Sequence, residues 1–190
     1  MDLPDRHIIR VVTLSGDRPL LLTVWSFILF FVFLAIGIVV YASATGDASF
    51  TFTVRSLPDL LPLFALVILI LLVGAIHEGL HALAYLLLHR RPLFGWGRTS
   101  LLFYCSCSAD GEYTRSESIF VLVAPFVLIT ALGIGAIAVA PAWGIAALIA
   151  VPLNAAGSAA DLRAAGLILR TPQKSLVLEE GGTLTVFVRE

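Results

Sequence analysis

Long apolar stretches dominate the sequence and limit what the chain can fold into. The first, at 20–41, contains no charged residue, and a helix of about 22 residues is about 33 Å long, enough to cross the hydrocarbon core of a bilayer. Three more follow at 60–88, 119–140 and 143–169. Apolar residues make up 59% of the chain and charged residues 13%, which leaves too little polar surface for a soluble domain. The sequence therefore predicts an all-α integral membrane protein with about four transmembrane helices, forming one membrane domain over 1–190.

Two polar segments are long enough to carry structure of their own. Residues 89–118 form the one sizeable internal loop, and the Asp110-Gly111 pair within it is typical of a hairpin turn. We therefore expect a short β-hairpin-like loop with strands on either side of this pair. The tail, 171–190, predicts two further short strands around Gly181-Gly182.

The distribution of positive charges predicts the orientation in the membrane. Eleven of the twelve lysines and arginines lie before the first apolar stretch, between the second and third, or within and after the fourth. Only Arg55 lies between the first and second, and none lies between the third and fourth. Because positively charged loops stay in the cytoplasm, we predict that both termini, the loop 89–118 and the tail 171–190 are cytoplasmic.

Other features exclude or leave open further classes. The first apolar stretch is too long for the core of a cleavable signal peptide, and no small-residue cleavage site follows it. The net charge of -1 argues against binding to nucleic acid, which requires a basic surface. Cys105 and Cys107 are separated by one residue and are poorly placed for an ordinary disulfide. They are expected to be two free thiols, with a regulatory metal or redox role as the alternative.

The second apolar stretch contains three ionisable side chains within five residues, His77, Glu78 and His81, in the order His-Glu-x-x-His. Ionisable groups at membrane depth are energetically costly and mark functional sites. Residues four apart on a helix share a face, so both imidazoles can bind one zinc ion. Glu78 can then act as the general base for a water that zinc activates. Alternatively, these residues pack as polar side chains between helices, or the motif is a chance match.

A zinc site needs a third protein ligand, and Asp161 is the other acidic residue within an apolar stretch. The predicted orientation makes the second and fourth helices run in the same direction. His81 and Asp161 each lie nine residues before an arginine, Arg90 and Arg170, and hence about 13 Å from the cytoplasmic end. Matched depth allows the two side chains to share one metal ion.

Asn154, Ser158 and Asp161 form a polar stripe along one face of the fourth stretch. Asn154 and Ser158 are candidates for contacting the substrate or orienting a metal ligand, and ordinary hydrogen bonds between helices are the other interpretation. Asp161 has an alternative role as a carboxylate near a helix end that pairs with Arg163 or Arg170.

These residues resemble the putative zincin peptidase family, a domain of unknown function found in small bacterial and archaeal membrane proteins. That family is similar to the core of site-2-type intramembrane metalloproteases. The resemblance covers the chain from about Leu60 onward. It rests on the His-Glu-x-x-His motif at 77–81, on Thr114-Arg115, on Ala124-Pro125 and on the segment 154–161.

The resemblance implies one Zn²⁺ per chain, held by His77, His81 and Asp161, with Glu78 as the catalytic acid and base. It also implies substrates that are membrane proteins or peptides, and a location in the plasma membrane of a prokaryote. In site-2-type relatives the acidic ligand is followed by glycine, whereas Leu162 follows it here.

The sequence therefore predicts a zinc-dependent intramembrane metalloprotease whose partners are the lipid bilayer and a membrane-embedded or membrane-adjacent peptide. Two other classes stay open. One is a non-catalytic zinc-binding membrane protein, and the other is a metal-free scaffold or transport-type protein. A transporter of this size would have to oligomerise, and the sequence contains no half-repeats.

Overall fold

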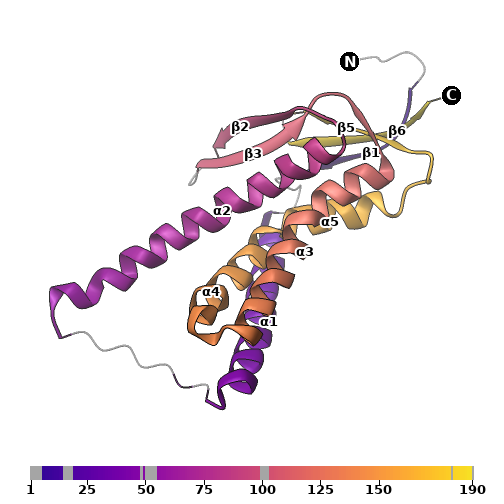
Figure 1. The fold of residues 1–190 in the computed structure, drawn as a ribbon. Helices are drawn as coiled ribbons and strands as arrows, with labels where there is room; N and C mark the ends of the chain where they lie inside the picture. Colours follow the sequence, from indigo (N-terminus) through magenta and orange to yellow (C-terminus); the bar gives the residue numbers. More distant parts are fainter. Residues whose placement is uncertain are drawn as a thin grey trace. The chain divides into compact units, whose positions relative to one another are not determined.

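The computed structural model describes residues 6–14, 19–47, 49, 55–98, 103–180 and 182–189 (Figure 1). The chain divides into two compact units. The first, here called the sheet unit, comprises Met1–Thr23, Glu78–Pro125 and Ser158–Glu190. The second, here called the helical unit, comprises Val24–His77 and Phe126–Gly157.

Helices make up most of the described chain. They are α1 (Pro19–Thr45), the short 3-10 helix η1 (Leu57–Leu60), α2 (Leu61–Leu87), α3 (Arg115–Val139), α4 (Pro141–Gly157) and α5 (Ala159–Ile168). By length and composition, α1, α2 and α3 could each cross a membrane, and α4 with α5 could form a fourth span if the bent pair counts as one. Within the described residues, three of the predicted long apolar helices are therefore confirmed, and the fourth stretch forms the bent pair α4 and α5.

Local sequence signals explain where several helices begin and end. Proline occupies the first position of α1 and of α4, where a missing N–H group is tolerated. Thr114 and Glu117 form a capping box at the start of α3, since the Glu117 N–H donates to Thr114 Oγ1 (3.3 Å) and the Thr114 N–H donates to Glu117 Oε2 (2.7 Å). His89, with φ 58°, follows the end of α2 in the left-handed conformation that often closes helices.

The fourth predicted helix, at 143–169, is broken rather than continuous. The axes of the flanking segments, Gly144–Gly157 and Ala159–Ile168, differ by 46°. The break lies at Gly157 and Ser158, and Gly-Ser pairs are a common cause of kinks because glycine favours the helix weakly. The break gives Asp161 a place in the first turn of a new helix.

Two antiparallel sheets extend the predicted β content, so the fold is mostly rather than entirely helical. A four-stranded sheet has the order β1-β6-β5-β4, and a two-stranded sheet pairs β2 with β3. Their bounds are β1 Arg6–Thr13, β2 Pro92–Arg98, β3 Phe103–Ala109, β4 Glu112–Thr114, β5 Leu176–Glu180 and β6 Thr183–Arg189. The predicted hairpin in the tail is confirmed as β5 and β6, with Gly182 at φ 75°, while Gly181 lies outside the described residues.

The predicted pairing across Asp110-Gly111 is wrong, although a tight turn with Gly111 at φ 96° does occur there. Strand β3 pairs with the preceding β2, and β4 pairs with β5 of the tail. Burial explains the choice, because Tyr113 on β4 and its partner Val177 on β5 are both buried. The internal loop therefore contains a hairpin, but one formed by β2 and β3.

The core of the sheet unit lies where the four-stranded sheet packs against α5 and the start of α3. Its buried residues are Val12, Leu122, Ala164, Ala165, Ile168, Val177, Leu184 and Val186. Strand β1 was not predicted from the sequence, and it contributes Val12 to this core. Packing of Ala164, Ala165 and Ile168 on the sheet fixes the rotation of α5 about its axis and hence the direction of Asp161.

Close packing of α3 on α4 in the helical unit depends on Gly133. A Cβ atom at this position would lie 2.3 Å from Cγ2 of Val151, which is fully buried and β-branched. Nothing lies within 4 Å of the corresponding point at Gly135 on the same helix.

We therefore expect Gly133→Ala to lower the stability of the protein by about 1–3 kcal/mol, the usual cost of overpacking a core. Gly135→Ala is the matched control and should be neutral or slightly stabilising, because alanine favours the helix. Thermal unfolding of both variants in detergent measures the difference. Equal melting temperatures for the two variants would contradict the close packing.

Candidate metal centre

His77, Glu78 and His81 lie on consecutive turns of α2, as the motif predicts. His81 is buried, and His77 and Glu78 are partly buried. The turn after His81 is anchored in the sheet unit by a second apolar cluster, in which α2 packs against β3, β4 and α3. Its buried members are Ala82, Ala84, Tyr85, Cys107, Ala109, Tyr113 and Val121. This packing holds in place the turn of α2 that follows the motif.

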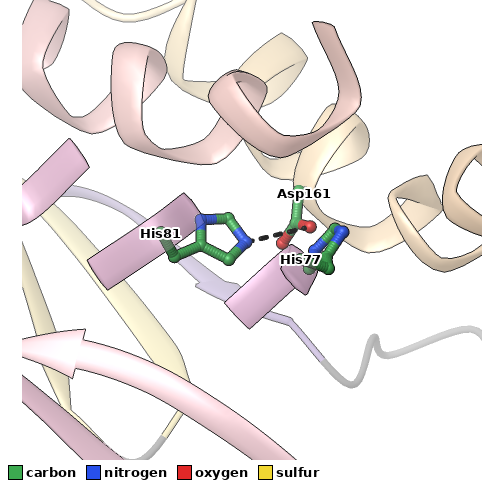
Figure 2. A group of neighbouring side chains, drawn as sticks. All are labelled: His77, His81 and Asp161. Atoms are coloured by element: carbon green, nitrogen blue, oxygen red, sulfur yellow. Dashed lines mark ion pairs between the residues drawn. The ribbon is translucent and has the colours of Figure 1, made fainter. Parts of the chain in front are cut away.

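Asp161 joins the two histidines. One ligand atom from each of His77, His81 and Asp161 lies within 4.8 Å of the other two, and Figure 2 shows the three side chains gathered together. His81 Nε2 is 3.6 Å from Asp161 Oδ2. Zinc holds nitrogen and oxygen ligands at about 2.0–2.2 Å in a tetrahedral arrangement, which separates ligand atoms by about 3.4 Å. Two imidazoles and a carboxylate at these separations fit a zinc ion.

Hydrogen bonds at Nδ1 set the tautomer of each ring and hence the nitrogen that can bind a metal. His77 Nδ1 lies 2.9 Å from Asn154 Oδ1, and His81 Nδ1 lies 3.0 Å from the Val121 carbonyl oxygen. Both oxygens only accept hydrogen bonds, so each ring donates from Nδ1 and keeps a lone pair on Nε2. Outer hydrogen bonds of this kind orient metal-ligating histidines and raise their basicity.

The Val121 carbonyl is available to His81 because of Pro125. In an α-helix the carbonyl of residue 121 accepts from the N–H group of residue 125, and proline has none. Pro125 lies inside α3, so the freed carbonyl oxygen can accept the His81 Nδ1 proton. The Ala124-Pro125 pair therefore has a direct structural connection to the metal centre.

The predicted polar stripe is divided by the helix break. Asn154, on α4, is almost fully buried at 2% exposure and contacts His77, which supports a role in orienting that ligand. Ser158 is fully buried at the break, and its carbonyl oxygen accepts from the Leu162 N–H group (2.9 Å). A substrate-contacting role for Ser158 stays a prediction.

Asp161 lies in the first turn of α5, where free N–H groups and the helix dipole favour a negative charge. Arg163, one candidate for pairing with Asp161, donates to the Thr13 carbonyl oxygen at 3.5 Å. The structure therefore directs Asp161 toward His81, as the zinc interpretation requires.

The two cysteines are free thiols. Burial, followed by the nearby Glu78 and Glu179, raises the pKa of Cys107 to about 12. A thiol with so high a pKa stays protonated at neutral pH, and the thiolate is the form that binds metals and reacts. This environment favours an unreactive thiol at Cys107.

Glu179, on β5, is the residue near the motif that the sequence did not predict. Tyr85, one turn after His81, donates to Glu179 Oε2 at 2.9 Å. The only signal in the sequence was the Glu179-Glu180 pair in a predicted strand, where neighbouring side chains point to opposite faces and one of them must face inward.

Comparison with known proteins identifies one family. The sequence model of the family described as "Putative zincin peptidase" matches residues 70–176, which is more than half of the chain. The matched region includes the motif on α2 as well as Asn154, Ser158 and Asp161. Searches of curated proteins and of solved structures gave no significant match.

The connection between Pro125 and His81 predicts an effect on metal affinity. Pro125→Ala adds an N–H group that competes for the Val121 carbonyl, so we expect zinc to bind about tenfold more weakly, as when an outer partner of a ligand is removed. Pro152→Ala, inside α4, is the control and should leave the affinity unchanged. Competition with a chelator measures both variants, and an unaltered affinity for Pro125→Ala would contradict the connection.

Proposed function

The chain belongs to the putative zincin peptidase family, and we propose that it is a zinc-dependent metallopeptidase that hydrolyses peptide bonds within or beside a membrane. The observation that carries this proposal is the group formed by His77, His81 and Asp161, whose ligand atoms lie within 4.8 Å of one another. The tautomers set by Asn154 and the Val121 carbonyl support it, because they make Nε2 the unprotonated nitrogen of both rings.

Each residue has a distinct role in this proposal. His77 and His81 bind zinc through Nε2, and Asp161 binds it through the carboxylate. Zinc, when bound, activates a water molecule for attack and polarises the peptide carbonyl. Glu78 follows His77 directly and takes the proton from the attacking water. It then passes that proton to the amine nitrogen as the C–N bond breaks, so one water is consumed for each bond cut.

We propose that the apolar helices cross the plasma membrane of a prokaryote with both termini in the cytoplasm. Large apolar side chains such as Phe27 and Phe31 on α1, and Phe64 and Leu71 on α2, are exposed, which suits a lipid environment. The distribution of arginines and lysines supports the orientation. His81 lies six residues before the end of α2, about 9 Å along the axis, so the site would lie in the cytoplasmic half of the bilayer.

The substrate in this proposal is a peptide in an extended conformation. Carbonyl groups in a helix are engaged in hydrogen bonds, so a helical membrane segment must unwind locally before it is cut. In the described part of the chain, β3 pairs on one side only, with β2. Its other edge can add an extended peptide as a neighbouring strand. Cys107 on β3 packs in the same cluster as Ala82 and Tyr85 of α2, which brings this strand close to the motif.

The size of the donor set separates this proposal from the alternatives. Structural zinc sites are closed by four protein ligands, whereas catalytic sites have three and an open position. The metal-binding group among the described residues has three members. A non-catalytic zinc protein would require a fourth protein ligand. A metal-free scaffold would not require two histidines whose tautomers are set for metal binding.

Glu78→Gln tests the proposed chemistry. We expect this variant to keep its zinc but to cut at least about 100-fold more slowly, since the amide cannot accept a proton. The measurement is the rate at which fragments form from a pool of single-span peptides in liposomes, with Glu180→Gln, an exposed acid on β5, as the control. Cleavage by zinc-loaded Glu78→Gln at the rate of the unmodified protein would contradict the role of Glu78.

A further inference from the structure

Glu179 supplies a carboxyl group to the neighbourhood of the metal centre from outside the region that the family model matches. It lies on β5, and Tyr85 Oη donates a hydrogen bond to its Oε2 at 2.9 Å. Tyr85 is almost completely buried on α2, one helical turn after His81. Strand β5 of the four-stranded sheet therefore brings an acidic group into contact with the helix that carries the two histidines.

The charged groups around Glu179 belong to the metal centre. Burial raises the pKa of the Glu179 carboxyl, the Tyr85 hydrogen bond and His81 lower it, and Asp161 and Glu78 raise it further. Two elements therefore act on this carboxyl group, α2 through three of its side chains and α5 through Asp161.

Two strands bring further titratable groups toward Glu179. Burial, with Glu179 as the next contributor, raises the pKa of Tyr113 on β4 to about 12. Glu179 also raises the pKa of Cys107 on β3. Both groups are neutral at pH 7, so neither supplies a positive charge to balance the carboxylate.

No lysine or arginine in the described part of the chain forms an ion pair with Glu179. A carboxylate that is removed from water needs a compensating positive charge or gives up its own. Glu78 and Asp161 add negative charge to the same region. A divalent cation held by His77, His81 and Asp161 would supply positive charge to this acidic region.

Glu179 is nevertheless not one of the residues that would hold the ion. The group whose ligand atoms all lie within 4.8 Å of one another consists of His77, His81 and Asp161. The hydrogen bond from Tyr85 holds the Glu179 carboxyl outside this group.

We propose that Glu179, positioned by Tyr85, is an outer acidic residue of the metal centre that strengthens its affinity for zinc through charge and not through ligation. This inference rests on the zinc binding in the proposed function. It gives the C-terminal tail a direct role in retaining the metal, and it accounts for a partly buried acid that forms no ion pair with a lysine or arginine in the described chain.

Zinc affinity of the full-length, detergent-purified protein tests the inference by competition with a chelator. We expect Glu179→Gln to bind zinc about tenfold more weakly, in the range seen when outer partners of a metal site are removed. Glu179→Asp keeps the charge and should stay within about threefold of the unmodified protein. Glu180→Gln, the exposed neighbour on β5, is the matched control and should not change the affinity.

Proton release on zinc binding separates a charge effect from a packing effect. The zinc-free carboxyl of Glu179 has a raised pKa and keeps its proton to higher pH, whereas a nearby cation lowers that pKa and expels the proton. Calorimetry in buffers of different ionisation enthalpy should therefore show fewer protons released by Glu179→Gln than by the unmodified protein.

The outcomes distinguish the two proposals. Unchanged zinc affinity and proton release in Glu179→Gln would overturn the role of Glu179 and leave the peptidase proposal intact. If Glu179→Gln proves unstable on heating, Glu179→Asp decides, because a loss of affinity as large as that of Glu179→Gln would mean that packing and not charge is involved. An unmodified protein that binds no zinc overturns both proposals.

Discussion

The hydrogen bond from His81 Nδ1 to the Val121 carbonyl oxygen links the sequence to the chemistry of the site. A polar ring inside an apolar helix needs a partner, and most backbone carbonyls in a neighbouring helix are already engaged. Pro125 frees this one by removing the N–H group that would occupy it. One proline on α3 therefore sets the tautomer of a histidine on α2 and leaves its Nε2 directed at Asp161.

The break between α4 and α5 has a comparable consequence. A continuous helix would place Asn154 and Asp161 nearly two turns apart on a straight axis. The 46° bend at Gly157 and Ser158 instead gives each residue its own direction. Asn154 then reaches the Nδ1 side of His77, and Asp161 lies at the start of a helix that packs on the sheet through Ala164 and Ile168. Defects in two helices, one proline and one Gly-Ser pair, thus position the polar groups.

Much of the fold follows from the sequence, because length and apolar composition are local properties. The apolar stretches became helices, and the equal depth of His81 and Asp161 correctly anticipated that they lie together. Strand pairing was harder to predict. The Asp110-Gly111 turn was correctly located, but whether β4 pairs with β3 or with β5 depends on burial of Tyr113 against Val177, which lies more than 60 residues away in the chain.

The site was predicted from its side chains, and two groups near it were not predicted. The Val121 carbonyl is a backbone group, so no residue type predicts its role. Pro125 does indicate that this carbonyl lacks its usual partner within the helix. Glu179 is an acid in a short terminal strand, and its inward direction is set by a sheet whose order, β1-β6-β5-β4, depends on distant segments. The roles of Glu78 as base and of the three ligands stay predictions.

The zinc content of the purified protein tests the account most directly. Metal analysis of the unmodified chain after preparation with excess zinc should give about one zinc per chain, and His77→Ala and Asp161→Ala should each lose it, because a site with two of three protein ligands does not retain the ion. An unmodified protein without zinc, or an Asp161→Ala variant that keeps the full amount, would contradict the metal centre described for these residues.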